Sequence, residues 1–74
     1  MNGLSRLDIK QLRILNALIE LQSLSQVAKK MGLTQQAISE QLKKLRDIFD
    51  DHLFIRQGNK MVPTIKALSL QVPT

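Results

Sequence analysis

Apolar and polar positions alternate with a helical period over most of the chain. The first such stretch, LDIKQLRILNALIELQ, predicts a helix over residues 8 to 21, because its apolar side chains recur every three or four positions. The apolar stripe contains Ile9, Leu12, Leu15, Leu18 and Ile19. Asp8 suits the start of this helix, where a carboxylate faces the free N–H groups. Ile14 and Leu21 widen the stripe, so either the helix is buried on several sides or it also contacts a partner helix.

The second helical stretch, SLSQVAKKMG, carries signals at both of its ends. Ser23 followed by Gln26 matches a capping box, which satisfies free N–H groups at a helix start. Gly32 stands where helices commonly end in a left-handed turn that glycine adopts at little cost. The side chains expected to face the core are Val27, Ala28 and Met31. The small Ala28 allows the following helix to cross closely over this one.

A third helix, predicted over residues 34 to 49, has two contrasting faces. Thr34 is a good N-cap, and Leu33 with Ile38 forms a hydrophobic staple around it. At about 100° per residue, one arc holds Ile38, Leu42, Leu45 and Phe49. The opposite arc holds Gln35, Gln36, Ser39, Glu40, Lys43, Arg46 and Asp47. The apolar arc is expected to face a core, which leaves the polar arc for solvent or a ligand.

Beyond residue 49 the periodicity changes from helix to strand. The acidic pair at positions 50 and 51 breaks the helix, HLFIR and MVP predict two short strands, and QGNK predicts the turn between them. Pro63 suits a strand end because it cannot donate to a ladder. Thr64 can cap a last helix, IKALSLQ, which Pro73 is expected to stop after about two turns. His52 and the acidic pair are interpreted as a turn and not as a site.

These elements predict a mainly α fold with a small β-hairpin. Two helices joined by a short turn with a glycine suggest a helix-turn-helix, and the hairpin after them makes a winged helix-turn-helix of three helices and a two-stranded wing. The alternative is a pair of helices packed for stability alone, and the hairpin argues against it. The basic tip of the wing, Gly58, Asn59 and Lys60, can reach a minor groove or a phosphate.

Composition narrows the range of functions. The 74 residues form one domain at most, and a net charge of +5 favours a polyanionic partner, with nucleic acid ahead of a membrane surface. With no cysteine and one histidine, the chain is expected to have no disulfide, no metal site and no cofactor. No nucleophile–base pair, carboxylate pair or phosphate loop is present, so an enzyme is not expected. The sequence has no signal peptide or membrane-spanning run, which predicts a cytoplasmic protein that contacts no membrane.

The polar arc of the third helix predicts contacts with double-stranded DNA. Gln matches adenine in the major groove and Ser matches several bases, and the early turns of such a helix lie deepest. The candidates for base contacts are Gln35, Gln36 and Ser39. The candidates for phosphate contacts are Ser23 on the second helix and Lys43, Lys44 and Arg46 on the third. Glu40 either accepts from a cytosine amino group or, as we expect, pairs with Lys43 or Lys44.

The order of these motifs resembles the N-terminal DNA-binding domain of LysR-type transcriptional regulators, over about residues 7 to 67. That family shows an apolar first helix, a segment like SxTxAAxxLxxSQPAVSxxIxxLE, then LFxR, a glycine-containing wing and PTxxA. The chain has SLSQVAKKMGLTQQAISEQLKKLR, LFIR, QGNKMVPT and IKA, and it looks most like the branch of the nodulation-gene regulators. The resemblance implies that the start of the third helix contacts the major groove, and that the wing, residues 53 to 63, contacts the minor groove or the backbone.

Matching positions extend the list of candidates by resemblance. Thr34 and Gln35 stand at the family's Ser-Gln, which adds Thr34 to the base contacts, and Arg56 stands at the Arg of LFxR, which adds it to the backbone contacts. The chain departs from the family at Gln36, which replaces the usual Pro, and at Glu40, where Arg or His is common. These departures are expected to alter the operator preference more than the fold.

The family continues into a long linker helix and an effector-binding domain. We therefore expect residues 1–63 to be the DNA-binding domain and residues 64–74 a truncated start of the linker helix. The resemblance implies a homodimer or tetramer for a full-length regulator, with a small-molecule effector bound only by the absent C-terminal domain. Leu68, Leu70 and the surplus apolar residues of the first helix would pack in that dimer. These residues would bury much less surface area than a standard protein–protein interface does, so the chain alone is expected to be a monomer or weak dimer.

Two functions from different classes remain open. The first is sequence-specific binding of double-stranded DNA as part of a bacterial transcription regulator. The second is a protein-interaction module, in which the winged helix binds another protein or a truncated chain forms heterodimers with a full-length regulator.

Overall fold

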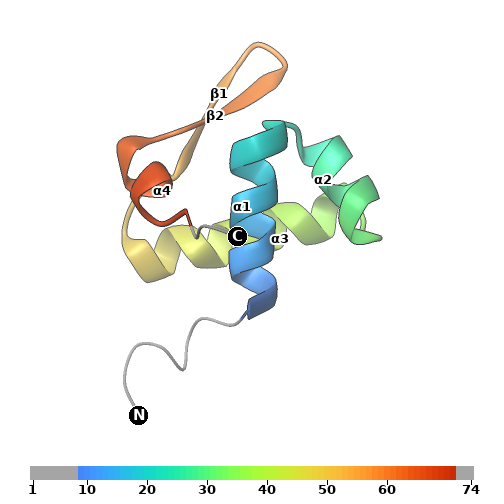
Figure 1. The fold of residues 1–74 in the computed structure, drawn as a ribbon, viewed down its shortest axis with the longest axis horizontal. Helices are drawn as coiled ribbons and strands as arrows, with labels where there is room; N and C mark the ends of the chain where they lie inside the picture. Colours follow the sequence, from blue (N-terminus) through green and yellow to red (C-terminus); the bar gives the residue numbers. More distant parts are fainter. Residues whose placement is uncertain (1–8, 72–74) are drawn as a thin grey trace.

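Residues 9–71 are described by the computed structural model, and they form four helices and one two-stranded hairpin (Figure 1). In chain order these elements are α1 (Ile9–Leu21), α2 (Leu24–Met31), α3 (Gln35–Phe49), β1 (Phe54–Gln57), β2 (Lys60–Pro63) and α4 (Ile65–Ser69). The mainly α fold with a winged helix-turn-helix arrangement is thereby confirmed. Asp8 and Pro73, expected at the start of α1 and beyond α4, lie outside the described residues.

α1 is buried on several sides, as one of its two interpretations predicted. Ile14, Leu15 and Leu18 have no exposed surface, and Ile19 is buried with them. Ile14 therefore belongs to the core and is not available to a partner helix. The expected burial of Ile9 is wrong, because this residue is 72% exposed. It begins α1, and that end of the helix projects beyond the elements that cover the rest (Figure 1).

The predicted caps of α2 and α3 are confirmed. The Ser23 hydroxyl accepts from the N–H of Gln26 at 3.3 Å, and the Thr34 hydroxyl accepts from the N–H of Ala37 at 3.1 Å. Gly32 ends α2 in the left-handed conformation, with φ of 70°. Some of the backbone groups that a helix leaves unpaired at its ends are thus satisfied locally, and a short turn joins α2 to α3.

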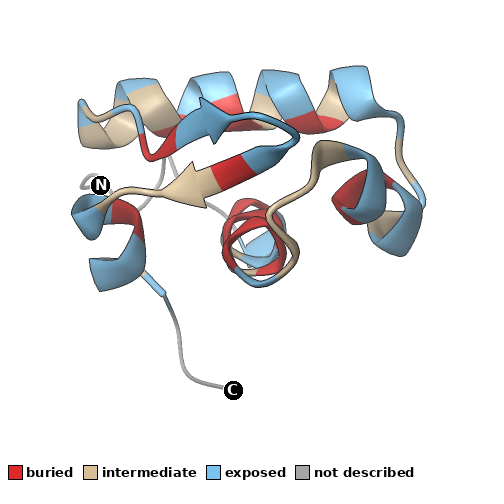
Figure 2. Ribbon diagram, turned by 90° about the horizontal axis from the view of Figure 1, so that it is seen from above, coloured by how far each residue is buried: buried red, intermediate tan, exposed pale blue. Residues whose placement is uncertain are grey.

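α3 packs across α1 and α2 through one edge. Ile38 and Leu45 have no exposed surface, and Leu42 keeps only 3%. Figure 2 shows buried residues on the side of α3 that faces the other helices and exposed residues on the opposite side. Burial of an aliphatic side chain of this size contributes about 1.5–3 kcal/mol. Three such side chains along one edge fix the rotation of α3 about its own axis.

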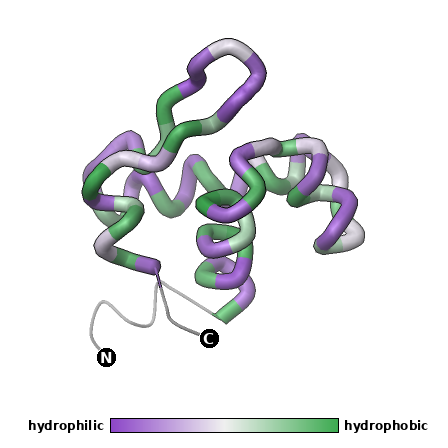
Figure 3. Tube along the Cα trace, turned by 45° about the horizontal axis from the view of Figure 1, so that its top comes forward, coloured by the Kyte–Doolittle hydropathy of each residue, from purple (hydrophilic) through white to green (hydrophobic). Residues whose placement is uncertain are grey.

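The wing is an antiparallel hairpin that pairs Phe54 with Pro63 and Gln57 with Lys60. Gly58 adopts the left-handed conformation, φ 61°, in the turn between the strands. Figure 3 shows hydrophobic residues toward the base of the hairpin and hydrophilic residues toward its tip. The base therefore belongs to the core, while the tip extends into solvent.

The first strand begins later than HLFIR predicted, at Phe54 instead of His52. Leu53 has a φ of 65°, and the N–H of Phe54 donates to the carbonyl of His52 at 2.7 Å. The side chains of Leu53 and Phe54 are both buried. Successive side chains of a strand point to opposite faces, so the chain has to turn at Leu53 to bring both into one core.

A backbone hydrogen bond ties the wing to the end of α1. The N–H of Met61 in β2 donates to the carbonyl of Gln22 at 2.9 Å. Gln22 follows α1 directly and has a φ of 54°, a conformation that few non-glycine residues adopt. Together with the buried side chain of Met61, this bond fixes the direction in which the wing leaves the helices.

Asp51 joins the turn after α3 to the start of α4. Its carboxylate accepts from the N–H of Leu53 at 2.8 Å and from the hydroxyl of Thr64 at 2.9 Å. Thr64 also accepts from the N–H of Ala67, which confirms it as the cap of α4. The hydrogen bond from Leu53, followed by that from Thr64, stabilises the charged form of Asp51 and lowers its pKa from the ordinary value of 3.8.

α4 is shorter than the stretch IKALSLQ predicted, because it ends at Ser69. The Ser69 hydroxyl donates to the carbonyl of Lys66 at 2.6 Å. The N–H groups of Leu70 and Gln71 then donate to carbonyls three residues back. Bonds of this shorter span belong to a 3₁₀ turn, which commonly closes a helix. The helix therefore ends before Pro73 could stop it.

We predict that Asp51→Asn reduces both the stability of the domain and its sensitivity to acid. A group with a lowered folded pKa contributes stability above its unfolded pKa and loses it as the pH falls through the folded pKa. The melting temperature of the original chain should therefore fall between about pH 5 and pH 2, and Asp51→Asn should reduce that fall. Thermal melts followed by circular dichroism measure it.

The control for this experiment is Asp47→Asn, which removes a carboxylate from the exposed face of α3. An Asp51→Asn chain with the same melting temperature as the original at both pH values would show that the negative charge of Asp51 contributes nothing to stability.

Candidate nucleic-acid interface

The outer face of α3 exposes the polar side chains that the sequence assigned to it. Its exposed residues include Gln35, Gln36, Ser39, Glu40, Lys43 and Lys44. Except for Gln35, which begins the helix, they lie away from its buried edge, and Figure 2 shows exposed residues along most of this side. The 15 residues of α3 make a rod about 22 Å long at about 1.5 Å per residue. The structure thus presents amides, a hydroxyl and cations along one accessible helical face.

The start of α3 presents polar groups from both side chains and backbone. Thr34 is exposed, and its hydroxyl oxygen accepts from Ala37 while its O–H remains able to donate outward. Gln35 and Gln36 are the first two residues of the helix and are also exposed. The backbone N–H groups of a first helical turn carry a partial positive charge. This end of α3 therefore suits a ligand that offers hydrogen-bond acceptors and negative charge.

The expected pairing of Glu40 with Lys43 or Lys44 is wrong. In residues 9–71 the one ion pair joins Lys30 to Glu20 at 4.0 Å. Glu40 is exposed on α3, where an ion pair one turn apart gains only about 0.3–0.5 kcal/mol and has to order two long side chains. Its carboxylate is therefore available as an acceptor on the outer face.

Arg46 holds the end of α3 against the start of the wing. Its Nε donates to the carbonyl of His52 at 2.6 Å, and Nη2 donates to the carbonyl of Phe54 at 3.1 Å. The guanidinium thus satisfies two backbone acceptors inside the domain. The sequence identified Arg46 as a phosphate contact and gave no sign of this role, because its partners are backbone groups of a turn whose conformation is set by packing. Asp51 was recognisable in part, since Asp often accepts from the N–H two residues on.

Ser23 lies away from α3, at the start of α2. Its hydroxyl is half-buried and lies 3.1 Å from the hydroxyl of Ser25 as well as accepting from Gln26. The cap is its observed role, and a phosphate contact stays a prediction. The neighbouring Ser25 is exposed and was not singled out from the sequence.

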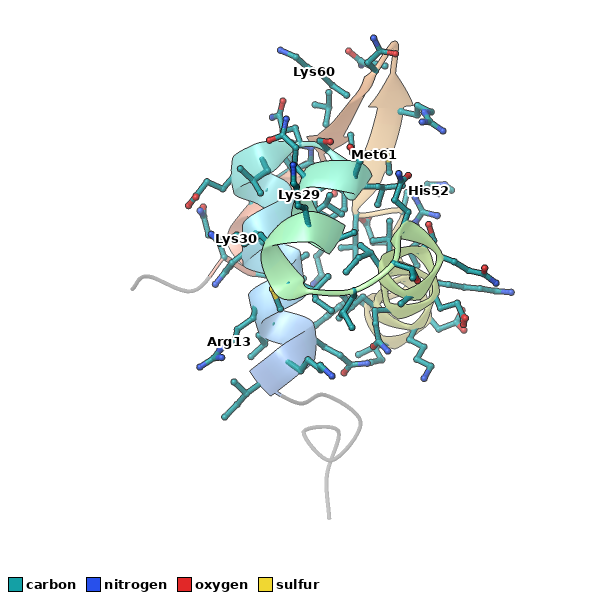
Figure 4. The ribbon with its side chains drawn as sticks, turned by 90° about the vertical axis from the view of Figure 1, so that its right-hand side faces the viewer. Arg13, Lys29, Lys30, His52, Lys60 and Met61 are labelled. Carbon is teal, nitrogen blue, oxygen red and sulfur yellow. The ribbon has the colours of Figure 1, made fainter. Side chains whose placement is uncertain are left out.

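The tip of the wing is exposed throughout. Arg56, Gly58, Asn59 and Lys60 all lie at the surface. Figure 4 shows Lys60 at the outer end of the hairpin, with Met61 directed back toward the helices. Because Met61 and Gln22 hold the base, the wing presents this polar tip in a defined direction. The structure brings no candidate residue of the wing into hydrogen-bond contact with those of α3.

Other kinds of site find little support in the part of the chain that the structure describes. Residues 9–71 hold no group of three or more His, Cys, Asp or Glu side chains that could bind a metal ion. Exposed His52 and Asp50 belong to the turn after α3, where the N–H of Asp50 caps the helix by donating to Arg46. Within the same residues, every helix is too short or too polar to cross a membrane.

The chain matches the model of a protein family. Residues 9–68 match the family model described as bacterial regulatory helix-turn-helix protein, lysR family. This span contains α1, α2, α3 and the whole wing, and it reaches into α4. The matched region therefore includes every element that carries a candidate residue.

Individual proteins agree with this match. Nodulation protein D 2 of Bradyrhizobium elkanii is 42% identical over 67 residues, which are 90% of this chain and 20% of that protein. The HTH-type transcriptional regulator PhcA of Ralstonia nicotianae is 46% identical over 63 residues, which are 85% of this chain and 18% of that protein. A crystal structure of a probable transcriptional regulator from Pseudomonas aeruginosa superposes with a TM-score of 0.85 and 38% identity, covering 92% of this chain and 23% of that chain.

The lengths and names of these relatives limit what the match shows about this chain. The chain spans about a fifth of the length of the curated proteins it resembles. A nodulation protein and other regulators match at comparable identity, so the resemblance to the nodulation-gene branch stays a prediction.

We predict that Arg46→Ala lowers the free energy of unfolding by about 1–2 kcal/mol, because it leaves two backbone carbonyls without a charged donor. Lys43→Ala, on the exposed face of the same helix, should leave the stability almost unchanged. Urea unfolding followed by circular dichroism measures both values. If Arg46→Ala were as stable as Lys43→Ala, the guanidinium would not be a structural tie and would be free to contact phosphates.

Proposed function

The chain belongs to the LysR family of bacterial regulatory helix-turn-helix proteins, a family of DNA-binding transcriptional regulators, and from this premise we propose that α3 enters the major groove of double-stranded DNA. The observation that carries the proposal is the exposed face of α3, which gathers Gln, Ser and Lys side chains opposite an edge that is fully buried. A major groove is about 12 Å wide and admits a helix.

We propose that the first two turns of α3 contact the bases. A Gln side chain can bond the N6 and N7 positions of adenine together, and a Ser hydroxyl can bond several bases. We propose these roles for Thr34, Gln35, Gln36 and Ser39. Glu40 is added as an acceptor for a cytosine amino group, which the absence of an ion pair to Lys43 or Lys44 supports.

We propose that cationic and hydroxyl side chains on and around α3 contact the phosphates. Lys43 and Lys44 are exposed further along α3, where the groove walls pass the helix. Ser23 at the start of α2 suits a second position on the backbone. Arg46 has its Nε and one terminal nitrogen engaged inside the domain, so any phosphate contact would use its other terminal nitrogen. We propose that Arg56 and the tip residues Gly58, Asn59 and Lys60 contact the minor groove or the backbone.

The wider regulator is proposed from the family alone. We propose that residues 1–63 form the DNA-binding domain and that residue 64 onward begins a linker helix. A longer regulator of this kind would act as a dimer or tetramer on chromosomal DNA in the bacterial cytoplasm, with an effector bound outside this domain. Ile65 and Leu68 of α4 are exposed, and Leu70 just after it is half-buried, so this short segment offers an apolar area well under a standard interface. The chain alone is therefore expected to be a monomer or weak dimer.

The test separates base contacts from phosphate contacts. A preferred site is first selected from random duplexes, and affinities for that site and for a scrambled duplex are then measured by fluorescence anisotropy. Gln35→Ala and Ser39→Ala should each lose about 1–3 kcal/mol of discrimination between the two duplexes. Lys43→Ala should weaken binding to both duplexes alike, because a phosphate contact carries no sequence information.

Two results decide the assignment. Equal losses on both duplexes for Gln35→Ala and Ser39→Ala would move these side chains to the phosphate-contacting class. Unchanged affinity for both duplexes in all three variants would mean that α3 is not the DNA-binding element.

A further inference from the structure

A second surface lies on the far side of the domain, between α1 and α2. It is an open groove of about 330 Å³ lined by Arg13, Asn16, Ala17, Glu20, Lys30 and Met31. Figure 4 shows Arg13 and Lys30 directed to the side of α1 and α2 that faces away from α3. The buried side chains of α1 and α3 lie between this groove and the outer face of α3. A duplex bound along α3 would therefore leave the groove open to solvent.

The groove combines an apolar floor with a basic rim. Ala17 is nearly buried and Met31 is half-buried, so together they offer carbon surface at the bottom. Arg13 and Lys30 are exposed on the rim. A thioether side chain such as Met31 adapts its shape to different apolar partners. The site thus suits a ligand that carries both negative charge and apolar side chains.

The ion pair at this groove does not close it. Lys30 meets Glu20 at 4.0 Å, at the outer limit of such a pair, and the two side chains are 56% and 70% exposed. Exposed pairs of this kind contribute little to stability, so an incoming carboxylate can replace Glu20 as the partner of Lys30. A neighbouring hollow lined by Leu21, Gln26, Lys29 and Lys30 shares that lysine. The basic rim therefore continues along α2 through Lys29.

We propose that the groove between α1 and α2 docks an acidic segment with apolar side chains from a protein partner. Carboxylates of that segment pair with Arg13 and Lys30, where a guanidinium favours a bidentate contact, and an apolar side chain packs on Ala17 and Met31. A nucleic acid fits this surface less well, because its phosphates offer no apolar side chain for the floor of Ala17 and Met31. The proposal does not depend on where α3 binds, and it gives the domain two faces that can be occupied together.

The test uses the 74-residue chain and a fluorescent peptide of Asp, Glu and Leu residues, with and without a duplex already bound. The double variant Arg13→Glu with Lys30→Glu should weaken peptide binding about tenfold or more, because like charges then face each other. Its affinity for the duplex should change less than about threefold at moderate salt, where distant charges are screened.

The matched control is Lys43→Glu with Lys44→Glu, which changes the net charge equally on the other face. This variant should lose duplex binding and keep the peptide. A second peptide with Ser in place of Leu should bind more weakly, because it cannot use the floor. Circular dichroism confirms that both variants fold before their affinities are compared.

Several results would overturn the proposal. If Lys43→Glu with Lys44→Glu removes peptide binding, or if a duplex displaces the peptide, the acidic peptide is occupying the DNA face of α3. If Arg13→Glu with Lys30→Glu impairs duplex binding as much as the control does, the groove is a nucleic-acid surface. No measurable peptide binding would also refute it. Failure of duplex binding alone would leave the peptide result standing, so the two proposals fail separately.

Discussion

The burial of Ile38, Leu42 and Leu45 along one edge of α3 is the interaction on which the rest of the structure depends. Because a helix has about 3.6 residues per turn, fixing one edge in the core also fixes which residues face outward. The amides and lysines of α3 are exposed as one face only because this apolar edge is held against α1 and α2. A helix free to rotate about its axis would present no defined pattern of donors and acceptors to a groove.

The two ends of α3 are held by polar contacts that position the other elements. At the N-terminal end, Thr34 caps α3 only two residues after Gly32 ends α2. The two helices are therefore joined by a very short turn. At the C-terminal end, Arg46 binds the carbonyls that lead into β1, and Asp51 connects the same turn to the cap of α4. The start of the wing and the cap of α4 are therefore held at the C-terminal end of α3.

Sequence patterns predicted the features that are decided locally. The caps at Ser23 and Thr34 and the glycine at the end of α2 depend on residues within one turn, and the structure confirms them. Two features decided by solvent or by distant packing were not predicted. Ile9 fits the apolar period yet is exposed, because none of the other elements within residues 9–71 buries that end of α1. Arg46 was interpreted as a surface cation because its acceptors are backbone carbonyls beyond the helix, which no side-chain pattern reveals. The exposure of the candidate side chains on α3 followed from the sequence, whereas their roles on DNA stay predictions.

The central claim is that this domain binds duplex DNA through charge on the α3 side, and the salt dependence of binding tests it most directly. The association constant for a labelled duplex is measured by fluorescence anisotropy across a series of salt concentrations. If the domain neutralises about four to six phosphates, the logarithmic slope should be roughly −4 to −5. Arg13→Ala, on the opposite face, should leave that slope unchanged. A slope near zero would contradict the account, because binding would then not rest on contacts with phosphates.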